Sequence, residues 1–201
     1  IEQGHWSLWD DESNQNKKII LTLNNSKLVA RDPISSIKDG IVGIDFGTKS
    51  TVVVYQEDTT KINPMRIGTG DLSKAVSKNH YENPTVIEFN DIESFISKYH
   101  QKKGRPKTRW SDITISHTAV NSMLASKSED YSSYFSELKQ WAGNKNKKLK
   151  ILDKNGLVVD IPSFLEINDE LNPIEIYAYY LGLYINNQHN GIFLNYILSF
   201  P

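Results

Sequence analysis

An acidic residue followed at once by a glycine turn is the feature of this sequence that could do chemistry. Asp45 comes near the end of the apolar run Ile41–Phe46, and the hydroxyl-bearing turn Gly47–Ser50 follows it. Burying a carboxylate is costly unless it serves a cation or collects hydrogen bonds, and Mg²⁺ prefers oxygen ligands with waters and phosphate oxygens. Successive N–H groups of a tight turn can hold phosphate oxygens. The pattern therefore indicates a phosphate clamp with a cation beside it.

The same turn has a plainer interpretation, because Asp, Gly, Thr and Ser are common turn formers. The apolar strands on either side, Ile41–Phe46 and Thr51–Tyr55, favour the functional interpretation. The turn joins two strands, opens no helix and lacks the Gly-Lys-Thr/Ser ending of a P-loop, so it matches neither the Walker nor the dinucleotide fingerprint.

The hydrophobic pattern predicts the elements that position this turn. Two apolar runs joined by so short a link can only form an antiparallel hairpin, and Pro84–Phe89 supplies a third strand. Residues 131–142 repeat apolar side chains at helical spacing, and Gly143 with Asn144 ends that helix. The fold class is therefore α/β with a mixed sheet.

The second half of the chain carries clearer signals. Leu149–Leu152 and Leu157–Ile161 flank an Asn-Gly hairpin tip, Asn172-Pro173 opens a helix, and Ile192–Phe200 is a final strand. Residues 1–40 form an N-terminal extension with a candidate hairpin, and residues 41–201 form the main unit.

Four stretches resemble the actin-like ATPase superfamily, which contains actin, sugar kinases and DnaK-type chaperones (the heat shock protein 70 family). Ile44–Thr51 looks like its first phosphate motif, Asn83–Phe89 like the chaperones' third strand, and Phe135–Gly143 like the helix bearing their catalytic lysine. Asn172–Pro201 resembles the helix-then-strand unit that closes the first lobe. The resemblance spans roughly residues 41–201 and implies an RNase H-like mixed sheet with flanking helices, first lobe only.

The resemblance also implies roles for the matching residues. Asp45 would hold the Mg²⁺ of bound ATP or ADP through water. Lys139 would reach the γ-phosphate and the attacking water, and Pro201 would be a hinge proline in interdomain signalling. The implied phosphate-binding residues are Gly47, Thr48, Lys49, Ser50 and Thr51. The implied activity is Mg-dependent ATP hydrolysis that controls a partner or substrate-binding domain.

The sequence departs from the chaperones at several places. Lys49-Ser50-Thr51 stands where many have Thr-Asn-Ser, the lysine helix reads Lys-Gln-Trp-Ala-Gly, and the N-terminal extension has no counterpart in the housekeeping chaperones. We therefore expect a divergent, specialised relative. The second Mg²⁺-site aspartate, second phosphate motif, adenosine segment and peptide-binding domain do not occur in these residues. We expect a piece of a longer protein that alone binds ATP weakly or not at all.

Two other functions stay open. A carbohydrate kinase of the same superfamily usually places an arginine soon after the Asp-x-Gly-Thr turn, where this chain has Val52. A degenerate nucleotide-sensing or scaffolding module would keep the turn without turnover. The expected partners are the nucleotide, a second lobe, a substrate-binding domain, and a co-chaperone or client protein.

Composition excludes several classes of protein. The 201 residues contain no cysteine, which excludes a disulfide scaffold, a thiolate zinc site and a cysteine nucleophile. The net charge of −1 argues against nucleic-acid binding, and no apolar run approaches the roughly 20 residues of a membrane span. The basic run Lys102–Arg109 is interpreted as a solvated loop. High Lys, Ile and Asn usage favours a bacterial cytoplasmic protein.

Overall fold

The computed structural model describes residues 20–23, 26–29, 36–57, 60–68, 75–100, 108–167 and 171–199, the first two segments as backbone only. The first strands are β1 (Ile20–Leu23), β2 (Ser26–Val29), β3 (Ile37–Phe46), β4 (Ser50–Gln56), β5 (Asn63–Met65), β6 (Glu82–Pro84) and β7 (Ile87–Phe89). The later strands are β8 (Ile113–Ile115), β9 (Tyr134–Phe135), β10 (Leu149–Leu152), β11 (Val158–Ile161) and β12 (Ile192–Ser199). The helices are α1 (Ile92–Tyr99), α2 (Ser116–Ala125), α3 (Leu138–Gly143), α4 (Pro173–Gln188) and the 3₁₀ helices η3 (Lys78–Tyr81) and η4 (Ser128–Ser133).

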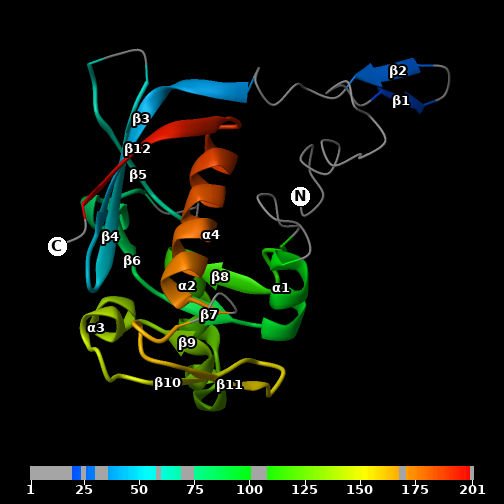
Figure 1. Ribbon diagram of the computed structural model, residues 1–201. Coiled ribbons are helices and arrows are strands. Elements are labelled where there is room, and N and C mark those ends of the chain that lie inside the picture. The colour runs from blue at the N-terminus through cyan, green and yellow to red at the C-terminus, as the bar shows by residue number, and fades with distance from the viewer. Residues whose placement is uncertain are drawn as a thin grey trace.

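A five-stranded sheet carries the candidate turn. Its strand order is β12-β3-β4-β5, and β6 pairs with the other end of β4. β3 is antiparallel to β4 and parallel to β12, while β5 and β6 are antiparallel to β4. Figure 1 shows the long β3–β4 hairpin beside β12, with α4 running next to them. The predicted hairpin and mixed sheet are confirmed.

The main sheet begins earlier than expected. β3 starts at Ile37 and runs through Gly40, where the boundary of the extension was expected. The N-terminal hairpin is present, because β1 and β2 pair antiparallel. The expectations for residues 1–19, for Lys102–Lys107 and for Pro201 lie outside the described residues.

Helix α4 covers the main sheet and matches its predicted start. Asn172 Oδ1 accepts the N–H groups of Ile174 (3.1 Å) and Glu175 (3.3 Å), and Pro173 occupies the first helical position. Tyr177 of α4 packs edge-on against the ring of Phe46, with centroids 5.7 Å apart. One continuous core joins these residues to a second sheet, of three strands in the order β8-β7-β9. Its fully buried members include Val42, Val53, Ile67, Ile87, Phe89, Ile92, Phe95, Ile113, Ile115, Leu138, Trp141 and Tyr180.

Strand β12 exposes apolar side chains on both of its faces. Ile197 lies beside Gly43 and is 64% exposed, whereas Leu198 lies beside Ile44 and is 61% exposed. Successive side chains of a strand point to opposite faces, so these two lie on opposite sides of the sheet. Within the described ranges, β12 pairs with β3 alone. None of its residues is charged.

The predicted third strand, Pro84–Phe89, is in fact two strands in different sheets. β6 ends at Pro84 and pairs with β4, whereas β7 starts at Ile87 and pairs with β8 and β9. The break has a physical reason: the Thr85 N–H donates to the Lys49 carbonyl, and the Val86 carbonyl accepts the N–H of Ser116. The first contact holds the chain at the sheet of β4 and β6, and the second holds the next residue at the sheet of β7, β8 and β9.

The predicted helix over residues 131–142 is wrong in its first half. Tyr134 and Phe135 form β9, paired with Glu88 and Ile87 of β7, and only Leu138–Gly143 is α-helical. Pairing with a buried strand outweighs the helical periodicity, because propensity is a weak prior against tertiary contacts. The predicted end of the helix at Gly143 is confirmed.

Helix α2 was not predicted. It starts at Ser116, directly after β8, and Ser116 has a φ of 58°, a left-handed conformation that non-glycine residues rarely adopt. Only Ser116 and Ala119 of this helix are fully buried, so its apolar residues form no clear stripe. The helix was missed because this pattern is weak. None of the helices in the described ranges has the length and apolar character that crossing a bilayer requires.

The hairpin predicted at Asn155-Gly156 is confirmed. β10 and β11 pair antiparallel over four residue pairs, and Gly156 has a φ of 88°. Asp153 stabilises this tip because its Oδ1 accepts the N–H groups of Asn155 (3.0 Å) and Leu157 (2.8 Å).

Candidate functional site

The carboxyl ends of two parallel strands meet at Asp45. Ser199 of β12 is the register partner of Asp45 on one side, and Val52 of β4 is its partner on the other. Open α/β sheets bind ligands outside the carboxyl ends of parallel strands. The Asp45 side chain is exposed, so the expectation of a buried carboxylate was wrong. An exposed carboxylate can still bind a hydrated cation.

The turn after Asp45 requires glycine at its first position. A Cβ on Gly47 would lie 2.3 Å from the Ser50 carbonyl oxygen, closer than real Cβ atoms approach another atom. The contact is with backbone, so the turn itself would have to move. Thr48 and Ser50 are half-buried, and Lys49 is exposed. The turn is therefore partly accessible to a ligand, as the phosphate-clamp prediction requires.

Thr85, which the sequence analysis placed only in a strand, anchors this turn. Its hydroxyl donates to the Gly47 carbonyl (3.1 Å), and its backbone N–H donates to the Lys49 carbonyl (3.0 Å). Thr51 Oγ lies 2.9 Å from Thr85 Oγ. Both threonines are fully buried. The Thr51 hydroxyl therefore faces Thr85 in the interior, and we remove Thr51 from the residues proposed to contact phosphate.

Tyr177 supports this anchor from α4. Its hydroxyl donates to the Pro84 carbonyl at 3.4 Å, next to Thr85. Burial raises the pKa of Tyr177 to about 12, so its hydroxyl stays protonated at neutral pH. The turn, β6 and α4 are thereby joined through polar contacts as well as through the core.

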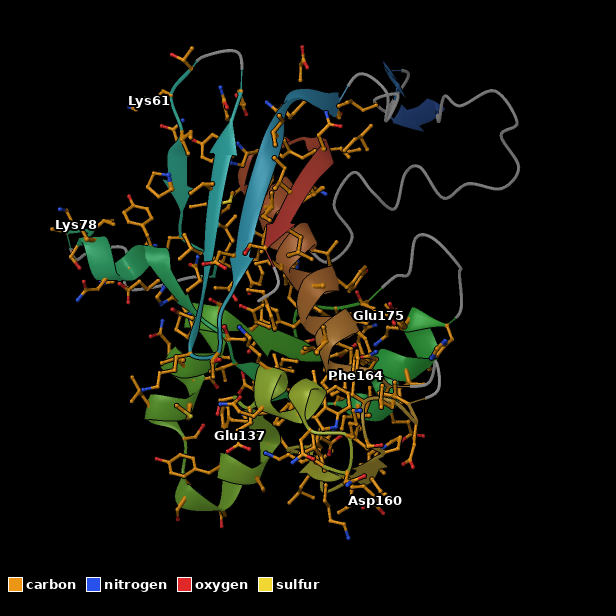
Figure 2. The ribbon with its side chains drawn as sticks, turned by 60° about the vertical axis from the view of Figure 1, so that its left-hand side comes forward. Lys61, Lys78, Glu137, Asp160, Phe164 and Glu175 are labelled. Carbon is orange, nitrogen blue, oxygen red and sulfur yellow. The ribbon has the colours of Figure 1, made fainter. Side chains whose placement is uncertain are left out.

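Lys139 lies in α3, at the same end of the sheet as the β3–β4 turn in both views (Figures 1 and 2). Buried Leu138 and Trp141 hold this helix against the core, and the Trp141 indole N–H donates to the Pro162 carbonyl at 3.1 Å. The Lys139 side chain is half-buried. Among the described residues it forms no ion pair, whereas nearby Lys147 pairs with Glu137. Its ammonium group is therefore available to an anion.

A second polar cluster surrounds Glu88 of β7, whose carboxylate is only 2% exposed. It pairs with Lys154 from the β10–β11 turn and accepts hydrogen bonds from the hydroxyls of Thr114, Ser122 and Tyr134. Burial alone would raise the pKa of Glu88, but these hydrogen bonds outweigh it and hold the pKa below its ordinary value. With every partner supplied by the chain itself, this cluster is structural.

The donor set near the turn fits Mg²⁺ that arrives with a nucleotide. Mg²⁺ usually keeps several waters and takes one or two carboxylates together with phosphate oxygens. Asp45 supplies one exposed carboxylate beside the turn. The described residues contain no group of three or more histidine or acidic side chains that could enclose a metal ion by themselves.

No protein-family model and no curated protein matches this chain.

Proposed function

We propose that this chain supplies the first lobe of a Mg-dependent ATPase domain of the actin-like, DnaK type. The sheet supports the proposal, because antiparallel β3, β4 and β5 are followed, after strands β6 to β11 and their helices, by helix α4 and by β12, which returns parallel to β3. This order is the one that an RNase H-like lobe would have. The carrying observation is Asp45 at the joined carboxyl ends of β3 and β12, one residue before a turn whose first position leaves no room for a Cβ.

Each proposed residue then has a physical task. Asp45 would orient a hydrated Mg²⁺ through water, and the turn backbone of Gly47, Thr48, Lys49 and Ser50 would surround the phosphate oxygens. Bound Mg²⁺ would neutralise phosphate charge. Lys139 contributes a positive charge at the terminal phosphate, where charge builds up during phosphoryl transfer. These groups sit on strand ends and a short helix anchored in the core, so they are held in place before the ligand arrives.

This lobe would form one wall of an interlobe cleft, with the second lobe and a substrate-binding domain as partners. We therefore predict that the 201-residue chain by itself binds Mg·ATP weakly or not at all. Isothermal titration calorimetry checks this prediction. Tight, saturable binding of Mg·ATP by this chain alone would contradict the single-lobe proposal. Bacterial cytoplasmic location remains a prediction from composition.

The proposed activity is tested in the longer protein. We expect Lys139→Ala to lower single-turnover ATP hydrolysis about 100-fold or more, while the affinity for Mg·ADP changes by only about twofold. Lys145→Ala is the matched control, because Lys145 is an exposed lysine just after α3 and forms no ion pair with a described residue. Equal turnover in the Lys139 and Lys145 variants would contradict the role of Lys139.

The same measurements separate the other functions. Binding of Mg·ADP without turnover in the wild type would favour a nucleotide-sensing or scaffolding module. Phosphate transfer to a sugar, with little hydrolysis to water, would favour a carbohydrate kinase. Asp45→Asn should weaken Mg·ADP binding about tenfold in an ATPase, since it removes the carboxylate that orients the metal.

A further inference from the structure

Thr85 holds the candidate turn through a directed chain of hydrogen bonds. A threonine hydroxyl has a single proton, and that of Thr85 is donated to the Gly47 carbonyl. The 2.9 Å contact between the two threonine hydroxyls must therefore be donated by Thr51. The chain runs from Thr51 to Thr85 to the Gly47 carbonyl. The Thr85 N–H adds a second bond, to the Lys49 carbonyl.

These two carbonyls set the direction of the N–H groups that follow them. A peptide unit is planar, and in the trans form its C=O and N–H point in opposite directions. The described residues contain no cis peptide bond. Because the carbonyls of Gly47 and Lys49 both point at Thr85, the N–H groups of Thr48 and Ser50 both point to the other side of the turn.

Two backbone N–H groups on one side of a turn form a concave pair of donors, which favours an anion. Among the described residues, Thr48 N–H donates to no other atom. Lys49 adds a positive charge on the same turn. We propose that Thr85 is the positioning residue of this turn, which rotates two peptide planes so that Thr48 and Ser50 present a two-donor site for phosphate oxygens. The inference rests on the proposed function, and it assigns the turn geometry to Thr85.

Three variants of the 201-residue chain test this inference, with inorganic pyrophosphate as the probe. Thr85→Val keeps the volume and the backbone N–H of Thr85 but removes the hydroxyl. Thr85→Ser keeps the hydroxyl and is the rescue variant. Thr51→Val is the matched control, because it removes one buried hydroxyl from the same pair but leaves the bond from Thr85 to Gly47 intact.

Nuclear magnetic resonance supplies two readouts: the Gly47 carbonyl ¹³C shift, and the amide shifts of Thr48 and Ser50 during the titration. We expect Thr85→Val to move the Gly47 carbonyl resonance and to weaken pyrophosphate binding about tenfold, as for one charge-assisted hydrogen bond. Thr85→Ser and Thr51→Val should stay within about twofold of the wild type. The carbonyl shift needs no ligand, so a purely structural weakening of the protein would not reproduce this pattern.

Wild-type affinity and an unmoved Gly47 carbonyl in Thr85→Val would overturn the inference. An absence of Thr48 and Ser50 shifts in the wild type, up to the highest soluble pyrophosphate concentration, would overturn it as well. Failure of the proposed function looks different: Asp45→Asn and Lys139→Ala would leave ATP turnover by the longer protein unchanged, while the pyrophosphate pattern persisted on this chain.

Discussion

Replacing Gly47 by alanine should destabilise the protein, because its new Cβ has no room. The Cβ would lie 2.3 Å from the Ser50 carbonyl oxygen, and real Cβ contacts essentially never fall below 3.0 Å. The backbone must therefore open by at least the difference, 3.0 − 2.3 = 0.7 Å. The Thr85 hydrogen bonds to Gly47 and Lys49, now 3.1 and 3.0 Å long, would stretch beyond useful length.

The size of the effect follows from those two bonds. Each lost hydrogen bond costs about 1 kcal/mol, and a donor of Thr85 left buried without a partner adds about 1–3 kcal/mol. Alanine restricts the unfolded chain more than glycine does, and this effect by itself raises the free energy of unfolding by about 0.5–1 kcal/mol. We therefore expect Gly47→Ala to lower the free energy of unfolding by about 2–4.5 kcal/mol.

Urea denaturation followed by tryptophan fluorescence measures this change. Gly143→Ala is the matched control, because nothing lies within 4 Å of its new Cβ and the residue ends helix α3. Alanine there should be neutral or stabilise by up to about 1 kcal/mol. If Gly47→Ala proved as stable as the wild type, within about 0.5 kcal/mol, the close approach and the rigid turn described above would be refuted.

Three further predictions concern stability. Ser116→Gly should raise the free energy of unfolding by about 1 kcal/mol and the melting temperature by about 2–4 °C. The reason is that glycine relieves the φ of 58° and removes a buried hydroxyl that has no partner among the described residues. If both Ser116→Gly and Ser116→Ala lowered the melting temperature, this explanation would be wrong. Asn172→Ala should cost about 1 kcal/mol in urea denaturation, since it removes the cap of α4, and no change would contradict the two N–H contacts of that cap. The pKa of Glu88 is lower in the folded than in the unfolded state, so the stabilisation that the Glu88 carboxylate provides is lost as the pH falls through the folded pKa. Urea titrations from pH 7 into the acid range should therefore show a smaller loss of stability in Glu88→Gln than in the wild type. Equal losses in the two proteins would contradict a stabilising role of the Glu88 carboxylate.

The elements that could be predicted are those whose signals are local. The β3–β4 hairpin follows from two β-branched runs and a short link, and α4 follows from the Asn172-Pro173 cap. The β10–β11 hairpin follows from an Asn-Gly tip that needs a positive φ. In each case neighbouring residues specify both the element and its end, so no distant contact had to be known.

The features that could not be predicted depend on contacts between distant residues. The break between β6 and β7 depends on a bond from Thr85 to Lys49, and β9 exists because Tyr134 and Phe135 pair with β7. Periodicity and propensity do not contain such contacts. The role of Thr85 likewise connects residues 38 positions apart in the chain.

The exposure of the Asp45 side chain could have been predicted from the sequence. Alternation along β3 places Val42 and Phe46 in the core, so the residue between Ile44 and Phe46 must face the other way. The exposure of Asp45 therefore follows from a period of two, and it makes the carboxylate easier to reach by a hydrated cation.

Strand β12 has a consequence for how this polypeptide is handled during synthesis and purification. Its run Ile-Phe-Leu-Asn-Tyr-Ile-Leu-Ser has no charge, proline or glycine, which are the residues that normally keep an edge strand from joining strands of other molecules. Six of its eight side chains are exposed. Such a segment is where intermolecular β-pairing begins when protein is concentrated. We therefore expect inclusion bodies and precipitation to start at β12, and Ile197→Lys to raise the soluble yield.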